Sequence, residues 1–353
     1  MKLKRQSSVV CLALLLAFIP RHAQAAMLPK KQIAADAKWL LHVELDDFRA
    51  SQVGGFVEKR FVTENLAELA KNLKFDVGAL LKKVSSVTAY GVDYGRGARD
   101  DLASGVLLIR ADAEAQKVLE GFLAAQMLAN TNSPVKQLQT EPYPLYSVAK
   151  DIFAAVHPNH TFIVGKSRGQ IDKARAVLLG EGPNLTSSTA LADFPTAPDS
   201  FFCIAVAEGF SEHAGLPTQA KVLQMTDGAR VALGEKADRL FLTLDLKAKT
   251  TEVVTQIQQV LQGVLALFSL GEIKDQDVVE LVQAIKVSAK DKVVSIGVDY
   301  PVAKAITKLE EQAAGAEKTA NRPNKGTKKQ PKARQSTSTA EPEAPEKNSK
   351  PTE

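Results

Sequence analysis

The chain is poor in cysteine, histidine and tryptophan, and these shortages exclude several kinds of site. Its 353 residues include two cysteines, five histidines and one tryptophan. Cys11 lies in the N-terminal segment that is predicted below to be a cleaved signal peptide. After cleavage only Cys203 is left, so the mature protein can form no internal disulfide bond. Zinc sites need three or four protein ligands, drawn mostly from cysteine and histidine. His157 and His160 flank one turn near Asp151, which is more typical of a solvated loop. We therefore expect no metal and no cofactor.

Cys203 lies in the apolar run Phe201–Val206. A catalytic thiol needs basic, partly exposed surroundings and a histidine partner. In this run we expect a small buried hydrophobic side chain instead.

Long hydrophobic runs are also missing. Basic residues within the first five positions precede an apolar run from Val9 to Ile19 and the small-residue sequence Ala23-Gln24-Ala25. The apolar run is too short to cross a bilayer, which takes about 20 residues. This pattern predicts a signal peptide over residues 1–25, with cleavage before Ala26. The mature protein is expected to be exported, to the periplasm or the cell exterior, without a transmembrane segment.

Positive charge is concentrated at the two ends of the chain. The formal net charge is +5. The signal segment and residues 316–353 each contribute +4, so the body between them carries −3. The tail lacks apolar clusters and is expected to be disordered. It could bind an anionic envelope polymer, but it has no aromatic residue for base stacking, so nucleic acid is not expected. The candidate anion-binding residues are Lys318, Arg322, Lys325, Lys328, Lys329, Lys332 and Arg334.

The clearest strand and helix pattern lies between Arg239 and Phe268. Four leucines from Leu240 to Leu246 alternate with Phe241, Thr243, Asp245 and Lys247, which is the two-residue period of a strand. Apolar residues at helical spacing follow up to Phe268. We expect the leucines to face the core and the alternate face to be exposed, where a partner could bind.

The first strand, from Lys38 to Asp46, shows the same alternation. Its apolar residues Trp39, Leu41 and Val43 are expected to face the core. His42, Glu44 and Asp46 form a polar face, which we interpret as solvated and not as an acid–base set. Asp46, Asp112 and Asp245 are interpreted as turn or helix-start residues and not as a carboxylate pair.

The pattern as a whole predicts an α+β fold of two similar lobes, each a mainly antiparallel sheet packed with helices. Matching strand–helix units in the two halves indicate a tandem duplication. Asp227-Gly228 is a strong turn signal and predicts a hairpin of Lys221–Met225 with Ala229–Leu233. The predicted segments are a signal peptide (1–25), a first lobe (26–182), a Pro-rich linker (183–198), a second lobe (199–315) and a disordered tail (316–353).

The sequence Gly165-Lys166-Ser167-Arg168-Gly169 has the G-x-S-x-G spacing of a hydrolase nucleophile turn. A triad at Ser167 would need an acid and then a base, and the candidates are Asp193 or Asp199 and, after them, His213. The motif lies between a predicted strand and a predicted helix, as in such hydrolases. Its partners are nevertheless crowded into fewer than fifty residues and the neighbouring strands look antiparallel, so the motif is only a hypothesis. A serine hydrolase therefore remains the enzymatic alternative to a non-enzymatic protein.

The segment from Ala35 to Gly55, which reads Ala-Asp-Ala-Lys-Trp, strand, aspartate and short helix, resembles the opening of exported bacterial α+β proteins of unknown function. The resemblance implies that the protein is exported, and it indicates no particular reaction. The function favoured by the sequence is an exported, non-enzymatic binding or scaffolding protein of unknown ligand. The alternatives are the hydrolase and an envelope protein tethered to an anionic polymer by its basic tail. A protein partner is equally open.

Overall fold

The computed structural model describes residues 28–62, 77–94, 105–129, 133–188, 191, 201–209, 221–270 and 276–320. The chain divides into two compact units, Met1–Leu309 and Glu310–Glu353. The predicted signal peptide, most of the predicted linker and most of the tail lie outside the described residues.

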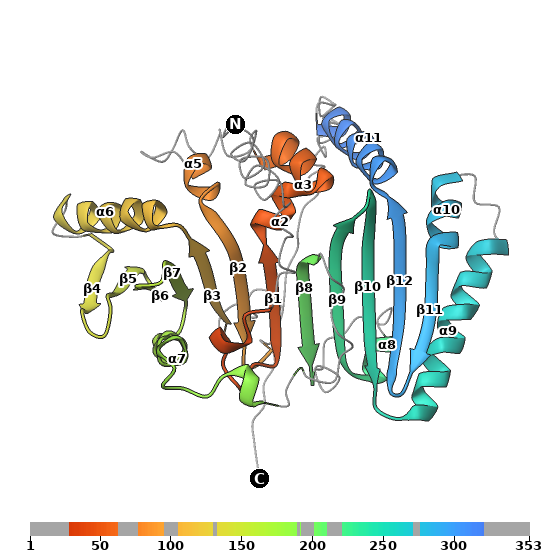
Figure 1. Cartoon of the computed structure of the whole chain (residues 1–353), viewed down its shortest axis with the longest axis horizontal. Coiled ribbons are helices and arrows are strands. Elements are labelled where there is room, and N and C mark those ends of the chain that lie inside the picture. The colour runs from red at the N-terminus through yellow and green to blue at the C-terminus, as the bar shows by residue number, and fades with distance from the viewer. Residues whose placement is uncertain are drawn as a thin grey trace, which may run out of the picture. The chain divides into compact units, whose positions relative to one another are not determined.

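The strands form one 12-stranded antiparallel sheet, so the fold is α+β as predicted (Figure 1). Their order across the sheet is β11-β12-β10-β9-β8-β1-β2-β3-β7-β6-β5-β4. The bounds of the strands are β1 Trp39–Glu44, β2 Val84–Gly91, β3 Gly105–Ala111, β4 Lys136–Gln139, β5 Leu145–Ala149, β6 Ile152–His157, β7 Thr161–Gly165, β8 Phe201–Glu208, β9 Thr226–Lys236, β10 Arg239–Ala248, β11 Ile285–Lys290 and β12 Val293–Pro301.

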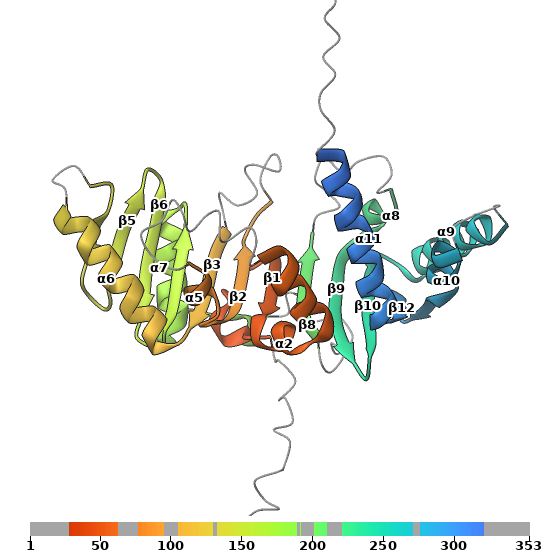
Figure 2. The same cartoon turned by 90° about the horizontal axis from the view of Figure 1, so that it is seen from above.

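Helices connect the strands and pack on both faces of the sheet. Seen from above, α6 lies with the strands of the first half, and α9 and α10 lie at the opposite end (Figure 2). The bounds of the helices are η1 Lys30–Gln32, α2 Leu45–Ala50, α3 Gln52–Val57, η2 Glu58–Val62, α5 Val77–Leu81, α6 Ala113–Ala129, α7 Arg168–Leu179, η3 Leu185–Ser187, α8 Lys221–Gln224, α9 Thr251–Leu270, α10 Gln276–Ala284 and α11 Val302–Ala320. Among the helices described, none is long and apolar enough to cross a membrane.

The two predicted lobes share this sheet, because β1 pairs with β8 at its centre. Outward from that pair, the order β1-β2-β3-β7-β6 on one side parallels β8-β9-β10-β12-β11 on the other. In both halves the third strand leads into a long helix, α6 or α9. The order of strands and helices is thus the same in the two halves, which agrees with the units matched in the sequence. A tandem duplication as the origin of these units remains a prediction.

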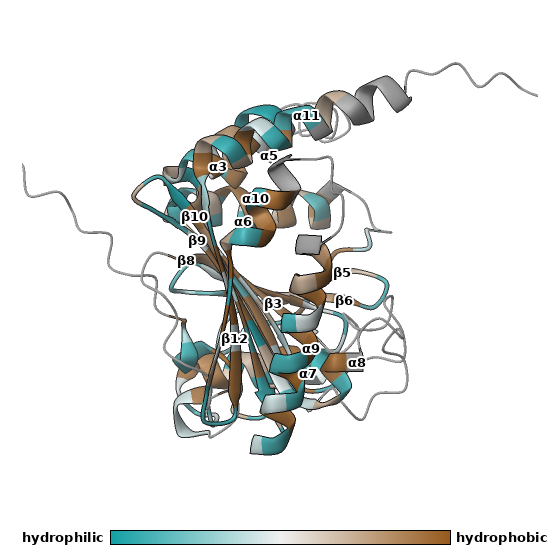
Figure 3. Cartoon of the chain, turned by 90° about the vertical axis from the view of Figure 1, so that its right-hand side faces the viewer, coloured by the Kyte–Doolittle hydropathy of each residue, from teal (hydrophilic) through white to brown (hydrophobic). Residues whose placement is uncertain are grey.

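Three clusters of buried hydrophobic residues hold the helices to the sheet. The first joins α7 and the segments around η1 and η3 to one face, through residues such as Leu40, Ile163 and Ile171. The second joins α6 to the opposite face. The third joins α8 and α9 to that same opposite face at the other end, around Leu246 and Ile257. Figure 3 shows the strands nearly edge-on as a twisted layer, with α7, α8 and α9 beside it.

The predicted hairpin at Asp227-Gly228 is wrong. Lys221–Gln224 is the short helix α8, and the strand begins at Thr226 and continues to Lys236. The chain reverses instead at Ala237 and Asp238, which both have a positive φ, and β9 pairs there with β10. Asp-Gly favours a turn locally, but the pairing of residues 228–234 with β8 on one side and β10 on the other outweighs that preference.

Candidate binding surface on the sheet

On one face of the sheet, three rows of side chains are entirely apolar over eight neighbouring strands, and Glu235 on β9 lies beyond the third row. We call this face the apolar face. The strand registers define it as three rows of cross-strand neighbours, which run from β3 to β11. The rows are Gly105, Gly91, Trp39, Ala207, Ala229, Leu246, Val294 and Ala289; Leu107, Ala89, Leu41, Ala205, Val231, Leu244, Ile296 and Val287; and Ile109, Val87, Val43, Cys203, Leu233, Leu242, Val298 and Ile285.

In the central strands this apolar face is the more exposed of the two. Along β9 the residues of the opposite face are buried from Thr226 to Gly234, whereas Ala229, Val231 and Leu233 are half-buried. Strands β8 and β2 alternate in the same sense. A half-buried strand normally turns its apolar side chains inward and its polar ones toward solvent. Here the half-buried face is the apolar one, and the opposite face buries polar residues beside hydrophobic residues of the first cluster, such as Leu40 and Ile204.

The opposite face, which we call the polar face, holds most of the buried polar residues that the structure describes. Arg230 on β9 donates to Asp245 on β10 from Nε and Nη2, at 2.9 and 2.5 Å. Ser295 on β12 donates to the other carboxylate oxygen at 2.5 Å. The side chains of Arg230 and Asp245 are 5% and 1% exposed. The prediction that Asp245 is a turn residue is therefore wrong, as is the predicted exposed face of this strand, because the carboxylate is paired across the sheet.

His42 is also buried on the polar face. Its Nδ1 lies 2.7 Å from Thr88 Oγ1 on β2, and its Nε2 lies 2.9 Å from Glu44 Oε1. The predicted solvated face of β1 is thus wrong for His42, while Leu41 on the opposite face is 42% exposed. The reason is that this face of β1 is packed, because Leu40 on the same face belongs to the first hydrophobic cluster. The three side chains satisfy one another and link β1 to β2.

The other two aspartates conform to the helix-start interpretation. Asp112 Oδ1 accepts the backbone N–H of Ala115 at 2.7 Å in the first turn of α6. That hydrogen bond is the main reason why the pKa of Asp112 is lowered. Asp46 lies in the first turn of α2 and pairs with Arg49 at 2.8 Å.

The exposed part of the apolar face lies between the second and third clusters. We call it the central strip, and it comprises Leu41, Val43, Cys203, Ala205, Val231, Leu233 and Leu242. Its residues belong to none of the clusters formed by the described residues. Leu41 is 42% exposed and Leu242 is 39% exposed, and the other five are half-buried. Exposed leucines in the middle of a sheet indicate a surface available to a partner.

Cys203 is part of the central strip. Its side chain is half-buried and not fully enclosed, so the expectation of a buried cysteine is correct only in part. Burial raises the pKa of its thiol above the usual value. The thiol is therefore neutral at pH 7 and adds no charge to the strip.

The G-x-S-x-G turn connects β7 to α7. Ser167 is the residue before the helix, and its side chain makes no capping hydrogen bond. Gly165 has a packing role, because a Cβ there would lie 3.1 Å from the backbone oxygen of Gly105. The proposed partners His213, Asp193 and Asp199 lie outside the described residues.

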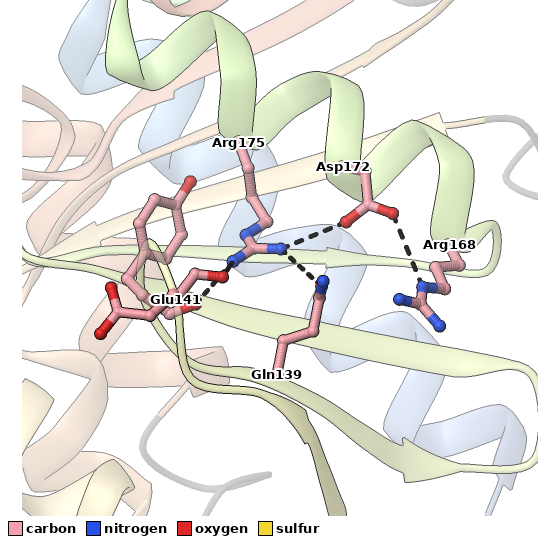
Figure 4. A network of polar contacts seen from close by, with 6 residues as sticks. Gln139, Glu141, Arg168, Asp172 and Arg175 are labelled. Carbon is pink, nitrogen blue, oxygen red and sulfur yellow. Dashed lines mark hydrogen bonds and ion pairs between the residues drawn. The ribbon is translucent and has the colours of Figure 1, made fainter.

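The polar contacts next to this turn centre on Arg175 of α7 (Figure 4). Its guanidinium bonds to the side chain of Gln139 at 3.0 Å and to the backbone oxygens of Glu141 and Tyr143 at 3.2 and 2.6 Å. It also lies 4.7 Å from the centre of the Tyr143 ring. Asp172 pairs with both Arg175 and Arg168, at 3.2 and 3.6 Å. These contacts hold the loop before β5 against α7, and Arg175 is 5% exposed, so the network stabilises the fold.

The described residues contain no group of three or more metal-ligating side chains. His157 Nδ1 lies 2.6 Å from Asn159 Oδ1, and His160 Nδ1 lies 2.5 Å from Gln116 Oε1. A cavity beside Tyr90 and Gln170 has a volume of about 10 Å³, which is room for one water molecule. Of the candidate tail residues, Lys318 lies in α11, and the other six lie outside the described residues.

Comparison with known proteins assigns no family. No protein-family model and no curated protein matches the sequence. Among solved structures, crystal form III of TP0453 is similar over 82% of this chain and 100% of its own, at 11% identity and a TM-score of 0.43. Crystal form I covers 81% of this chain and 98% of its own, at 11% identity and a TM-score of 0.41. At this level the similarity carries no function, so the evidence for function comes from the surface itself.

Proposed function

We propose that this protein is an exported, non-enzymatic binding protein that holds an apolar partner on the central strip. The observation that carries the proposal is the burial pattern of the central strands, which leaves Leu41 and Leu242 exposed while Asp245 and His42 are buried. Burying polar groups has a cost that only complete pairing offsets. Such a pattern has a physical reason if the apolar face is covered when the protein works.

Export is supported by the N-terminal basic, apolar and small-residue pattern. The mature protein is expected to begin at Ala26, which N-terminal sequencing of the exported fraction checks. A mature protein that retains residues 1–25 would contradict export by this route.

Binding is tested with the fluorescent dye anilinonaphthalene sulfonate. The native protein is expected to bind the dye, and the double variant Leu41→Asn/Leu242→Asn is expected to lose most of that fluorescence. The matched control is Leu128→Asn, because Leu128 on α6 is 88% exposed and lies outside the central strip. It should change the signal little. Near-ultraviolet circular dichroism must show that all three proteins retain fixed packing, since a molten state also binds the dye.

Equal dye binding by the native protein and the double variant, with native packing in both, would place the apolar site elsewhere. It would then remove the basis for the proposal.

A further inference from the structure

We infer that the central strip binds the aliphatic chain of an amphiphile, such as a fatty acyl chain. The inference rests on the proposed function and specifies its ligand. It depends on three features of the strip: its lack of polar groups, the pairing of its strands and its small open area.

The strip offers nothing to a ligand that needs hydrogen bonds. Its seven side chains are aliphatic apart from the thiol of Cys203, and that thiol is neutral at pH 7. Protein–protein interfaces carry roughly one hydrogen bond per 100–200 Å² and are enriched in Tyr, Trp and Arg at their centre. A methylene chain has no polar group to satisfy, so it matches this surface without leaving a donor or acceptor unpaired.

The backbone of these strands is already paired on both sides. Strand β1 pairs with β2 and β8, β8 with β1 and β9, β9 with β8 and β10, and β10 with β9 and β12. A peptide strand can add to a sheet only at an unpaired edge. Laid flat on the strip, a peptide would bury its own N–H and C=O groups without partners.

The open area is also too small for a second copy of the chain. Only Leu41 and Leu242 are more than a third exposed, and packed clusters close the apolar face at both sides. Four strands about 4.8 Å apart, with at most two strip residues about 7 Å apart on each, give a surface of roughly 200–300 Å², against about 800 Å² per partner in a stable complex. From β1 to β10 the strip spans three strand spacings, or about 14 Å. A narrow strip of this kind fits a single thin chain.

The test is a series of saturated fatty acids from octanoate to palmitate, titrated calorimetrically into the mature protein below their micelle concentrations. Affinity is expected to rise about fourfold per added CH₂ and then to level off once the chain exceeds the strip. The Leu41→Asn/Leu242→Asn variant should lose this chain-length dependence, and the Leu128→Asn control should keep it. Alkyl trimethylammonium salts of the same lengths should give the same dependence if the chain, and not the carboxylate, is recognised.

Cys203 provides an independent readout. Bound palmitate should slow its alkylation by N-ethylmaleimide at least tenfold in the native protein and much less in the double variant. Dye binding at the strip without any chain-length dependence would overturn the inference and leave the proposed function standing. If the strip shows neither dye binding nor chain-length dependence, both the inference and the proposed function are overturned. A native protein that is dimeric by light scattering, with Cys203 protected before any ligand is added, would assign the strip to a second copy.

Discussion

At the scale of single residues, the pair Arg230–Asp245 is the most consequential polar contact in the sheet. The two residues are direct cross-strand neighbours on β9 and β10, and both are almost fully buried. Because a buried charge must keep its partner, the pair also fixes the register of the two strands. A shift of one residue would separate the two charges and would turn the leucines of β10 to the other face.

We predict that Asp245→Asn will lower the free energy of unfolding by about 3–5 kcal/mol, because it leaves the guanidinium of Arg230 buried without its charge partner. Urea denaturation followed by circular dichroism measures the loss. The matched control is Asp299→Asn, which breaks the pair of Arg239 and Asp299 at 2.6 Å, where both side chains are about half exposed. Its cost should stay below about 1 kcal/mol. Equal losses in the two variants would contradict a special role for the buried pair.

At the scale of elements, periodicity predicted most strands and helices but not the face that each strand buries. The module from Arg239 to Phe268 forms β10 and α9 as predicted. Its alternation nevertheless gave the wrong exposed face, because Asp245 is neutralised by a residue on another strand. A two-residue period reports only that two faces differ. Which face is covered depends on the neighbouring strands and helices, and local sequence does not contain that information.

The candidate surface was unpredictable for the same reason. Leu41 and Leu242 are ordinary core-type residues in the sequence, and only the pairing of β1 with β8 brings their strands into one strip. The signal that could have suggested it is the set of apolar alternate positions in β1, β8, β9 and β10, combined with charged or polar residues on the other face of β1, β9 and β10. The G-x-S-x-G motif was easier to see, and it lies between the end of β7 and the start of α7.

Replacement by alanine should have opposite effects on stability at two glycines, one at the end of a helix and one inside a helix. Gly180 ends α7 with a φ of 79°, a left-handed conformation that costs other residues about 1 kcal/mol. Gly121 lies inside α6, where alanine is favoured over glycine by about 1 kcal/mol. A Cβ at either position meets no atom within 4 Å. Thermal unfolding should therefore show that Gly180→Ala lowers Tm and Gly121→Ala raises it, each by about 2 °C. Shifts of the same sign would contradict the assigned backbone conformations.

At the scale of the whole molecule, the chain combines a mildly acidic body with a basic C-terminal end. Helix α11 continues to Ala320, a few residues beyond the predicted start of the tail at 316. Deletion of residues 321–353 therefore removes the basic segment and preserves the helix.

If the tail tethers the protein to an anionic polymer, this deletion should abolish retention on a polyphosphate or heparin column at low salt, because the contacts act through counterion release. Tm should not change. A full-length variant with glutamine at the tail positions Lys325, Lys328, Lys329, Lys332 and Arg334 is the control, and it should behave like the deletion. Undiminished retention of the deleted protein would rule out the tether.

The position of β1 in the sheet has a consequence for folding. It is the first strand to be synthesised, yet its neighbours at the centre are β2 on one side and β8 on the other. Until β8 has been made, one edge of β1 has unpaired backbone groups, and its Leu41 and Val43 face no partner strand. Pairings between strands so distant in the chain form slowly, because a long loop must close first. The nascent first half therefore has an unpaired strand edge at β1, which can pair with another chain and aggregate. Pairing of β8 with β1 removes this edge.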